Sequence, residues 1–250
     1  MILLFVDETS DAKFKDYFGL SIAVINSNFY QILKSDFHKI LSDSGWEINI
    51  EFKGSYLFSA NSGCKNIPVD MRVEIASKIL ELNKSKINSR IKFAYFHKNS
   101  QDHRKDYLEY LPVLLDKILP AAQKAGDKDI IAVYCDRRSD MKPIEIQNVI
   151  QPVLNKRKYT LLENVVMTDS NFNTIGILYA DLVGYLSARI DTIKNDIELF
   201  ENIPPDQLEN NGKIKKLRSS QNLINAIKSI KAYTVKQDTG KDKKGEKGKK

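Results

Sequence analysis

The sequence predicts an α/β protein in which a mixed β-sheet is flanked by helices and folds as one main domain. Three observations predict this class. Short apolar runs recur along the chain, segments with helical spacing of apolar residues separate them, and the first two runs are close enough to form a hairpin. Strands that alternate with amphipathic helices bury their apolar faces against one another, which is typical of a layered α/β domain.

The first apolar run, residues 2–6, leads directly into Asp7 and Glu8 and is typical of a strand buried on both faces. Further strands are expected at 17–25, 46–53, 90–97, 130–135 and 159–168. Helices are expected at 26–43, 68–82, 103–124, 141–155, 174–193 and 213–231. Asn26 or Ser27 is a suitable N-cap for the first helix, and Pro112 and Pro120 should bend or split the third.

Composition and charge limit the classes of protein that the sequence can encode. The 250 residues carry a formal net charge of +7, but residues 240–250 hold six lysines against two acids, so the rest of the chain carries only +3. We expect the main domain at 1–197, a helical extension at 198–237 and a disordered basic tail at 238–250. The extension is a candidate surface for docking on the core, on a second copy of the chain or on a partner protein.

Cysteine content and hydropathy indicate the cellular setting. The two cysteines, Cys64 and Cys135, suggest neither a disulfide framework nor a thiolate metal site. We therefore expect a reducing, cytoplasmic setting. No stretch of about 18 apolar residues occurs, so no membrane-spanning helix is predicted. The short apolar start is followed by acids, unlike a signal peptide.

Carboxylates emerge from apolar surroundings at separate places in the chain. Asp7 and Asp136 each close an apolar strand, and Asp181 is the only charged residue between Ile175 and Ala188. Glu51 lies near the end of the predicted strand 46–53. A buried ionised carboxylate is unfavourable unless it is paired or bound to a metal, and neighbouring like charges raise each other's pKa. A salt bridge or a turn hydrogen bond is the structural alternative for each acid.

A shared divalent cation is the simplest common reason for these acids to meet. Oxygen ligands suit Mg²⁺ or Mn²⁺ better than zinc. Two such ions roughly 3.5–4 Å apart would clamp the attacking and leaving oxygens of a phosphodiester. Glu8 and Asp169 are secondary candidates, because Glu8 should point to the opposite side of its strand from Asp7 and Asp169 has the surroundings of a loop acid.

Basic residues beside the acids are candidates for binding phosphate. Lys53 lies next to Glu51, and Arg137 and Arg138 follow Asp136 directly. The exposed charge of a solvated loop is an equally good interpretation of the two arginines. His38, His97 and His103 show no metal-ligand spacing, and no Walker loop, dinucleotide fingerprint or nucleophile elbow occurs.

The order of these motifs resembles a known family. Residues 5–9, 17–20, 51–54, 134–136 and 175–183 resemble the bacterial domain-of-unknown-function family 3800 over about residues 1–190. Thr9 replaces the serine of the usual Asp-Glu-Ser start, and Leu178 and Tyr179 replace the usual residues before the Ala-Asp pair. The resemblance implies a ribonuclease H-like fold for the main domain, an association with mobile elements and phage defence, and the site residues Asp7, Glu51, Asp136 and Asp181.

The sequence therefore favours a metal-dependent nuclease that hydrolyses nucleic acid without a covalent enzyme intermediate. Two alternatives are open. One is a binding module with a nuclease-like fold that grips nucleic acid or a protein without cutting. The other is a structural subunit in which buried basic residues satisfy the acids. The lysine-rich tail could add sequence-independent affinity for nucleic acid.

Overall fold

The computed structural model describes residues 1–11, 14–47, 49–57, 66–83, 91–120, 129–171, 173–201 and 232–234. Its centre is a sheet in the order β5-β4-β1-β2-β3-β7, and β6 also pairs with β4. The strands of this part of the chain are β1 (Ile2–Asp11), β2 (Phe14–Asn26), β3 (Ile91–Asn99), β4 (Asp129–Asp136), β5 (Tyr159–Leu161), β6 (Val166–Thr168) and β7 (Ala232–Thr234).

The sheet is mixed, as predicted. β1 and β2 form the expected antiparallel hairpin, and β3 pairs antiparallel with β2. β4 lies parallel to β1 on its other side, and β5 and β6 are parallel to β4. The carboxyl ends of β1 and β4 therefore meet at the same edge of the sheet, where ligands bind in many open α/β sheets.

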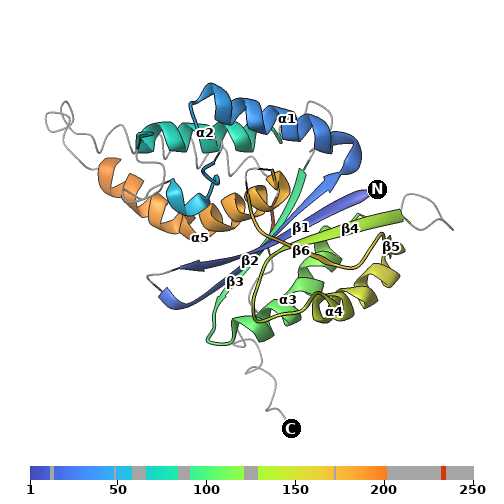
Figure 1. Cartoon of the computed structure of the whole chain (residues 1–250). Helices are drawn as coiled ribbons and strands as arrows, with labels where there is room; N and C mark the ends of the chain where they lie inside the picture. Colours follow the sequence, from blue (N-terminus) through green and yellow to red (C-terminus); the bar gives the residue numbers. More distant parts are fainter. Residues whose placement is uncertain are drawn as a thin grey trace, which may run out of the picture.

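Helices cover both faces of the sheet (Figure 1). On one face lie α1 (Ser27–Asp43), α2 (Val69–Glu81) and α5 (Ile175–Glu201), and on the other lie α3 (His103–Ile118) and α4 (Pro143–Lys156). Each face has its own buried apolar cluster. The predicted fold class, a mixed sheet flanked by helices, is confirmed.

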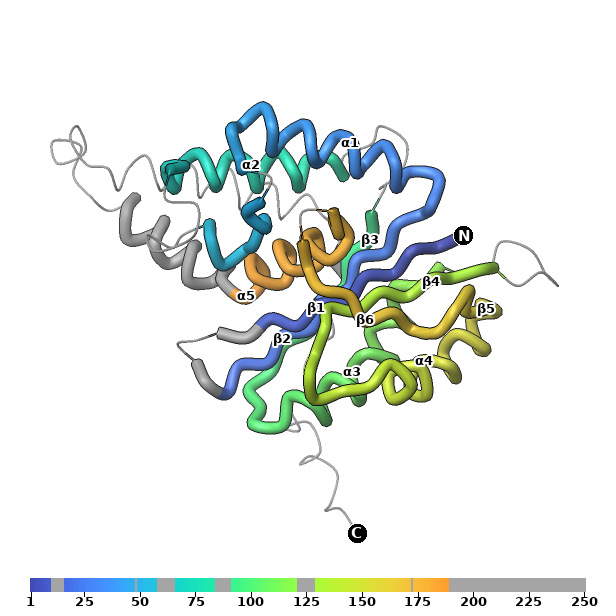
Figure 2. Tube along the Cα trace, viewed as in Figure 1, coloured from blue at the N-terminus to red at the C-terminus, as the bar shows by residue number. Residues whose placement is uncertain are grey.

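The first strand is buried on both faces because its apolar residues alternate between the two clusters. Leu3 and Phe5 belong to the cluster under α5, and Leu4 and Val6 belong to the cluster under α3 and α4. Figure 2 shows β1 in the middle of the sheet between β2 and β4. A continuous apolar run is the pattern that such a central strand needs.

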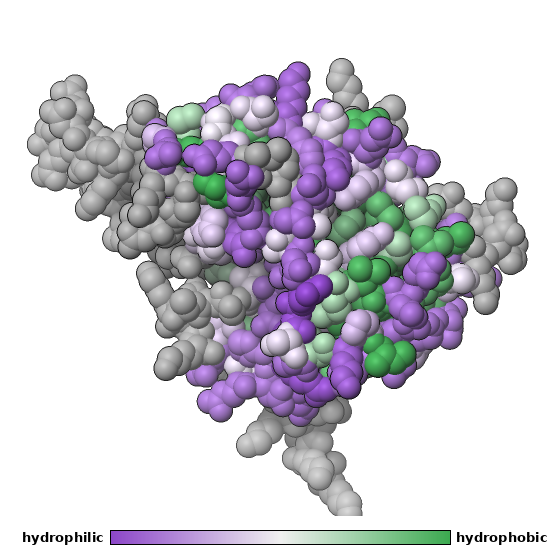
Figure 3. All heavy atoms as spheres, viewed as in Figure 1, coloured by the Kyte–Doolittle hydropathy of each residue, from purple (hydrophilic) through white to green (hydrophobic). Residues whose placement is uncertain are grey.

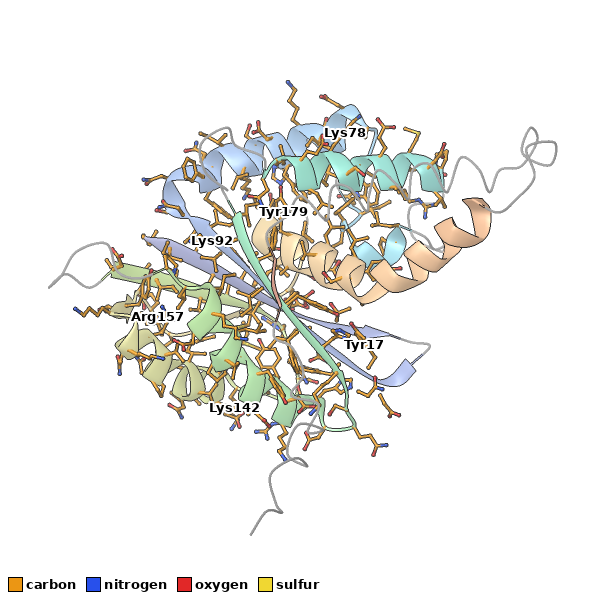
Figure 4. All side chains as sticks on the ribbon, turned by 180° about the vertical axis from the view of Figure 1, so that it is seen from behind. Tyr17, Lys78, Lys92, Lys142, Arg157 and Tyr179 are labelled. Carbon is orange, nitrogen blue, oxygen red and sulfur yellow. The ribbon has the colours of Figure 1, made fainter. Side chains whose placement is uncertain are left out.

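α5 lies between the sheet and the two outer helices. Tyr179, labelled in Figure 4, donates its hydroxyl hydrogen bond to the carbonyl of Ile79 in α2 over 2.6 Å, and its ring lies 5.6 Å from that of Phe37 in α1. The first helix begins as predicted, because the side chain of Asn26 accepts a hydrogen bond from the backbone N–H of Asn28.

The prediction of a strand at 46–53 is wrong. The described residues of this segment form turns that lead into the short 3₁₀ helix η1 (Gly54–Tyr56). The Trp46 indole donates to the carbonyl of Ile50 over 2.8 Å and packs against Phe52 with ring centroids 5.0 Å apart. The chain therefore curls around its own tryptophan in this segment.

The strand predicted at 159–168 is divided into β5 and β6. Leu161 pairs with Ile131, and Val166 pairs with Tyr134. The chain thus advances five residues while its partner strand advances three. Because the extra residues have no place in the ladder, the chain bends between the two short strands.

Two helix ends differ from the predictions. α3 ends at Ile118, since Leu119 precedes Pro120 and adopts an extended conformation; Pro112 lies inside the helix. α5 continues to Glu201, past the predicted helix end at 193. The helix predicted at 213–231 and the tail at 238–250 lie outside the described residues.

The surface in Figure 3 is mostly hydrophilic, with apolar side chains gathered over the edge formed by β4, β5 and β6. Ile130, Leu162 and Val166 are exposed there. Within the described ranges, no helix combines the length and the apolar character that crossing a membrane requires.

Candidate functional site

Two of the predicted acids lie side by side where the ladder between β1 and β4 ends. The last paired residues are Val6 and Cys135, and Asp7 and Asp136 follow them directly. The rings of Phe5 and Tyr134, two residues earlier on each strand, stack on the face covered by α5 with centroids 5.3 Å apart. Because side chains alternate along a strand, Asp7 and Asp136 point to that same face.

α5 brings the third acid to this place because small residues let it approach the sheet closely. A Cβ on Gly176 would collide with the ring of Phe5, and a Cβ on Gly184 would collide with Thr9 Oγ1. Ser21 Oγ donates to the carbonyl of Ala180 over 2.8 Å. The carboxylate of Asp181 follows directly and is held against the sheet.

The turn before η1 completes the site. The backbone N–H of Gly54 donates to Asp181 Oδ2 over 2.6 Å, and Lys53 Nζ lies 3.0 Å from Glu51 Oε2. A Cβ on Gly54 would lie 2.5 Å from Cβ of Tyr185, so only glycine allows this approach to α5. The structure thus brings Asp7, Glu51, Lys53, Asp136 and Asp181 together.

Burial and mutual repulsion make the acids weak. Burial, with the neighbouring Asp181 and Asp136 carboxylates, raises the pKa of Asp7 well above its usual value. Burial also raises the pKa of Asp181 to about 6, although the Gly54 hydrogen bond and Lys53 act against the rise. Burial raises the pKa of Asp136, and the backbone N–H of Arg137 offsets part of this change.

Lys53 is the basic side chain that these acids share. Burial lowers its pKa, but the hydrogen bond to Glu51 and the nearby Asp181 carboxylate outweigh that effect, so its pKa is raised. Its ammonium group lowers the pKa of Asp7, Asp136 and Asp181. One positive charge thus stabilises four carboxylates.

The secondary candidates lie elsewhere. Glu8 points to the opposite face from Asp7, as predicted, where it pairs with Arg138 and accepts from His103 Nδ1 over 3.1 Å. Asp169 is 69% exposed and pairs with Arg137 across 3.1 Å. Neither acid joins the group around Lys53.

Arg138 is held by several partners. Its Nε and Nη2 donate to the two carboxylate oxygens of Asp140 over 3.0 and 2.8 Å. Its guanidinium group lies 5.2 Å from the ring centroid of Tyr107. Arg137, with 63% of its side chain exposed, is the more accessible arginine.

A polar pocket of about 290 Å³ opens beside the acids at the strand ends. Its lining residues include Asp7, Glu8, Tyr107, Asp136 and Arg138. Sequence reasoning missed Tyr107, because a tyrosine within an amphipathic helix has no distinguishing pattern. It also missed the Gly54 N–H, since a backbone donor leaves no trace in the sequence.

The chemistry of the donors fits a hard divalent cation, because every acid in the group offers oxygen. Burial and crowding of like charges also favour occupation by a cation. In the described part of the chain, however, no three His, Cys, Asp or Glu side chains are already arranged as metal ligands.

No protein-family model matches the chain, and no curated protein matches it. The resemblance to family 3800 therefore has no support from a family model. Among solved structures, the chain is similar to ribonuclease H2 from Pyrococcus horikoshii OT3, with 13% identity, a TM-score of 0.45 and coverage of 92% of this chain and 100% of that chain. It is also similar to RNase HII from Archaeoglobus fulgidus in a complex with PCNA, with 11% identity, a TM-score of 0.40 and 87% of each chain covered. At these identities and TM-scores, the similarity supports no conclusion about the activity of the chain.

Proposed function

We propose that the chain is a divalent-metal-dependent nuclease that hydrolyses phosphodiester bonds in nucleic acid. The observation that supports this proposal is the meeting of Asp7, Asp136 and Asp181, from two strands and a helix, where the ladder between β1 and β4 ends. Three such acids with a shared lysine are poorly neutralised. A divalent cation would supply the missing charge.

Asp7, Asp136 and Asp181, with Glu51 beside them, would hold the ion. Bound Mg²⁺ or Mn²⁺ would supply Lewis-acid chemistry for attack of water on a phosphodiester. The Gly54 N–H fixes the orientation of Asp181, and the carboxylate of Asp7 has little access to solvent because the residue is buried. No covalent enzyme intermediate is needed.

Lys53 and Arg137 are the proposed contacts to phosphate. Lys53 is 39% exposed, and its ammonium group, now paired with Glu51, would be available to phosphate if Glu51 held a metal ion. The pair between Arg137 and Asp169 is largely exposed, so exchanging the carboxylate for a phosphate changes the free energy little. The two residues flank the acids and would guide the backbone of the substrate.

The test is cleavage of single- and double-stranded DNA and RNA in the presence of Mg²⁺ or Mn²⁺. We expect Asp136→Asn and Asp181→Asn to reduce the rate at least about 100-fold, because each removes a charge that a metal-ion mechanism requires. Glu163→Gln removes an exposed acid between β5 and β6 and serves as the matched control. Equal cleavage by all variants would show a contaminating nuclease or another site.

The second candidate is a module that binds nucleic acid without cutting it. It is favoured by the absence, among the described residues, of three preassembled metal ligands, and by the ion pair of Lys53 with Glu51. Salt-dependent binding that survives Asp136→Asn and Asp181→Asn, without cleavage by the wild type, would establish this candidate.

We further propose that the chain belongs to family 3800. The support is the set of motifs quoted above, whose acids are those found around Lys53. The family's association with mobile elements and phage defence is then the proposed context. The proposed context is tested in cells that carry either the wild type or Asp181→Asn. The measurement is the loss of nucleic acid from an invading element.

A further inference from the structure

The two strands that carry Asp7 and Asp136 lose their backbone connection just before the acids. Among the described residues, pairing between β1 and β4 ends at Val6 and Cys135, and β1 continues to Asp11 beside β2. Asp7 is still paired with Ser21 of β2 and Asp136 with Thr168 of β6, but in the described part of the chain no ladder pair joins β1 to β4 at or beyond the two acids. A side-chain contact beyond the end of the ladder would restrain their separation further.

An ion pair supplies that contact. Glu8 follows Asp7, Arg138 lies two residues after Asp136, and their side chains pair on the opposite face of the sheet from the acids. Only 17% of the Glu8 side chain and 15% of the Arg138 side chain are exposed, so solvent screens the pair less than it would a surface pair. We call this pair the Glu8–Arg138 clasp.

Both members of the clasp are held by further partners. Asp140 receives two hydrogen bonds from Arg138, which fixes the plane of its guanidinium group, and Tyr107 lies beneath that plane. His103, the first residue of α3, binds the other oxygen of Glu8 at 3.1 Å. The clasp therefore connects β1, the loop after β4 and α3 at one point.

We infer that Glu8 and Arg138 are positioning residues that set the separation of Asp7 and Asp136. The inference rests in part on the proposed function, since that separation matters most for binding a shared cation. It also replaces two hypotheses from the sequence. Glu8 is assigned to the clasp instead of to the metal, and Arg138 to Glu8 and Asp140 instead of to a phosphate.

A purely electrostatic role of the clasp predicts a different effect on cation binding from a positioning role. If the clasp acted only through charge, Arg138→Met would leave Glu8 uncompensated and tighten cation binding, whereas Glu8→Gln would weaken it. If the clasp sets the geometry of the acids, both substitutions weaken binding. The sign of the Arg138→Met effect therefore separates the two explanations.

The first experiment measures the dissociation constant for Mn²⁺ by calorimetry with the full chain. We expect Glu8→Gln and Arg138→Met each to weaken Mn²⁺ binding about tenfold, the effect typical of losing a residue that orients metal ligands. The double variant should be no weaker than either single variant, because one contact is lost in all three. Lys105→Met, which removes an exposed lysine from α3, should change the constant less than about twofold.

A conservative variant separates loss of the contact from loss of the fold. Arg138→Lys keeps the positive charge but cannot bind Glu8 and both oxygens of Asp140 in one plane. We expect it to weaken Mn²⁺ binding by a similar factor. Tighter binding by Arg138→Met, or a double variant in which the two single effects multiply, would overturn the inference.

A second measurement does not depend on a metal. Amide hydrogen exchange of residues 137–142 should rise about tenfold in Glu8→Gln and in Arg138→Lys, and change little in Lys105→Met. If the wild type binds no Mn²⁺, the proposed metal-dependent function fails, while faster exchange in these variants still supports the clasp. Unchanged exchange in both clasp variants would overturn the clasp whatever the result with metal.

Discussion

At the scale of single residues, the site is a place where the fold tolerates unfavourable charge. Asp7 is only 6% exposed, and burial raises the pKa of Asp7, Asp136 and Asp181. A carboxyl group with a raised pKa binds its proton more tightly in the folded chain than in the unfolded chain. The ionised form therefore destabilises the metal-free fold.

Replacing Asp181 should stabilise the metal-free protein near neutral pH. The pKa of Asp181 is about 6 in the folded chain, so the destabilisation is absent below about pH 4, grows between about pH 4 and 6, and is complete above about pH 6. We expect Asp181→Asn to raise the free energy of unfolding by about 1–2 kcal/mol at about pH 7. Urea unfolding at about pH 7 and about pH 4 measures the change.

The pH dependence is the decisive part of that prediction. The asparagine side chain introduced by Asp181→Asn can still accept the hydrogen bond from Gly54, so the gain should disappear at about pH 4, where Asp181 is already protonated. Glu163→Gln should leave the free energy of unfolding nearly unchanged at both pH values. A gain of equal size under the acidic and the neutral condition would exclude ionisation of Asp181 as its cause.

Removing the shared lysine should have the opposite sign. Lys53→Met removes the ammonium group that lowers the pKa of Asp7, Asp136 and Asp181. We expect the metal-free variant to lose about 1 kcal/mol of stability at about pH 7 and to recover it at about pH 4. Addition of Mn²⁺ should restore the melting temperature, whereas no response to Mn²⁺ would argue against a shared cation site.

At the scale of elements, α5 positions Asp181 because it fits closely on β1 and β2. Gly176, Ala180 and Gly184 recur every four residues and form one side of the helix. The side of α5 that faces the sheet offers little side-chain volume, so the backbones approach each other. Glycine is otherwise a poor helix former, which indicates that packing decides these positions.

Gly184→Ala should therefore destabilise the protein although alanine favours helix. Its Cβ would collide with Thr9 Oγ1 and lie 2.9 Å from Ser21 Oγ. We expect overpacking to lower the free energy of unfolding by about 1–3 kcal/mol in urea, against a gain of about 1 kcal/mol from helix propensity. The cleavage rate should fall as well, since α5 carries Asp181.

A second substitution tests the proposed contact. Thr9→Ala removes the hydroxyl that the new methyl group would meet, so the double variant should be more stable than Gly184→Ala alone. Ser187→Ala, a partly exposed position on the same helix, is the control for propensity. If Gly184→Ala proves more stable than the wild type, the close contact with Thr9 is not limiting.

At the scale of the whole molecule, the mixed sheet explains where the site lies. β1 is the strand that joins the antiparallel half, with β2 and β3, to the parallel half, with β4, β5 and β6. The parallel pair β1 and β4 brings two carboxyl ends to one edge. The acids are thus concentrated at that edge, while most of the basic excess lies in the tail.

The tail should contribute affinity for nucleic acid without contributing chemistry. Residues 240–250 carry a net charge of +4 out of +7. If its lysines contact phosphates, a chain ending at residue 239 should bind DNA more weakly, and the slope of log K against log salt should become shallower by about 3. Fluorescence titration at several salt concentrations measures the slope, and an unchanged slope would assign the phosphate contacts to the rest of the chain.

Local patterns were sufficient for much of this fold. The central strand and the hairpin with β2 followed from residues 2–6 and 17–25, because an apolar run of this length has few other stable arrangements. Asp181, the only charged residue between Ile175 and Ala188, was also evident, since a charge amid apolar residues requires a reason. The meeting of Asp7, Asp136 and Asp181 was predicted on the condition that the helix carrying Asp181 packs on the sheet.

The sequence by itself thus determined the layered α/β class and the acids that follow the apolar runs of β1 and β4. Only the tertiary structure decided that the described residues between Trp46 and Leu57 curl around the tryptophan, that Gly54 holds Asp181, and that Glu8 pairs with Arg138. The physical reason is the distance along the chain that separates the interacting residues. Periodicity records which face of an element is buried, whereas a hydrogen bond from a turn, or an ion pair between residues far apart in the chain, depends on how the elements pack.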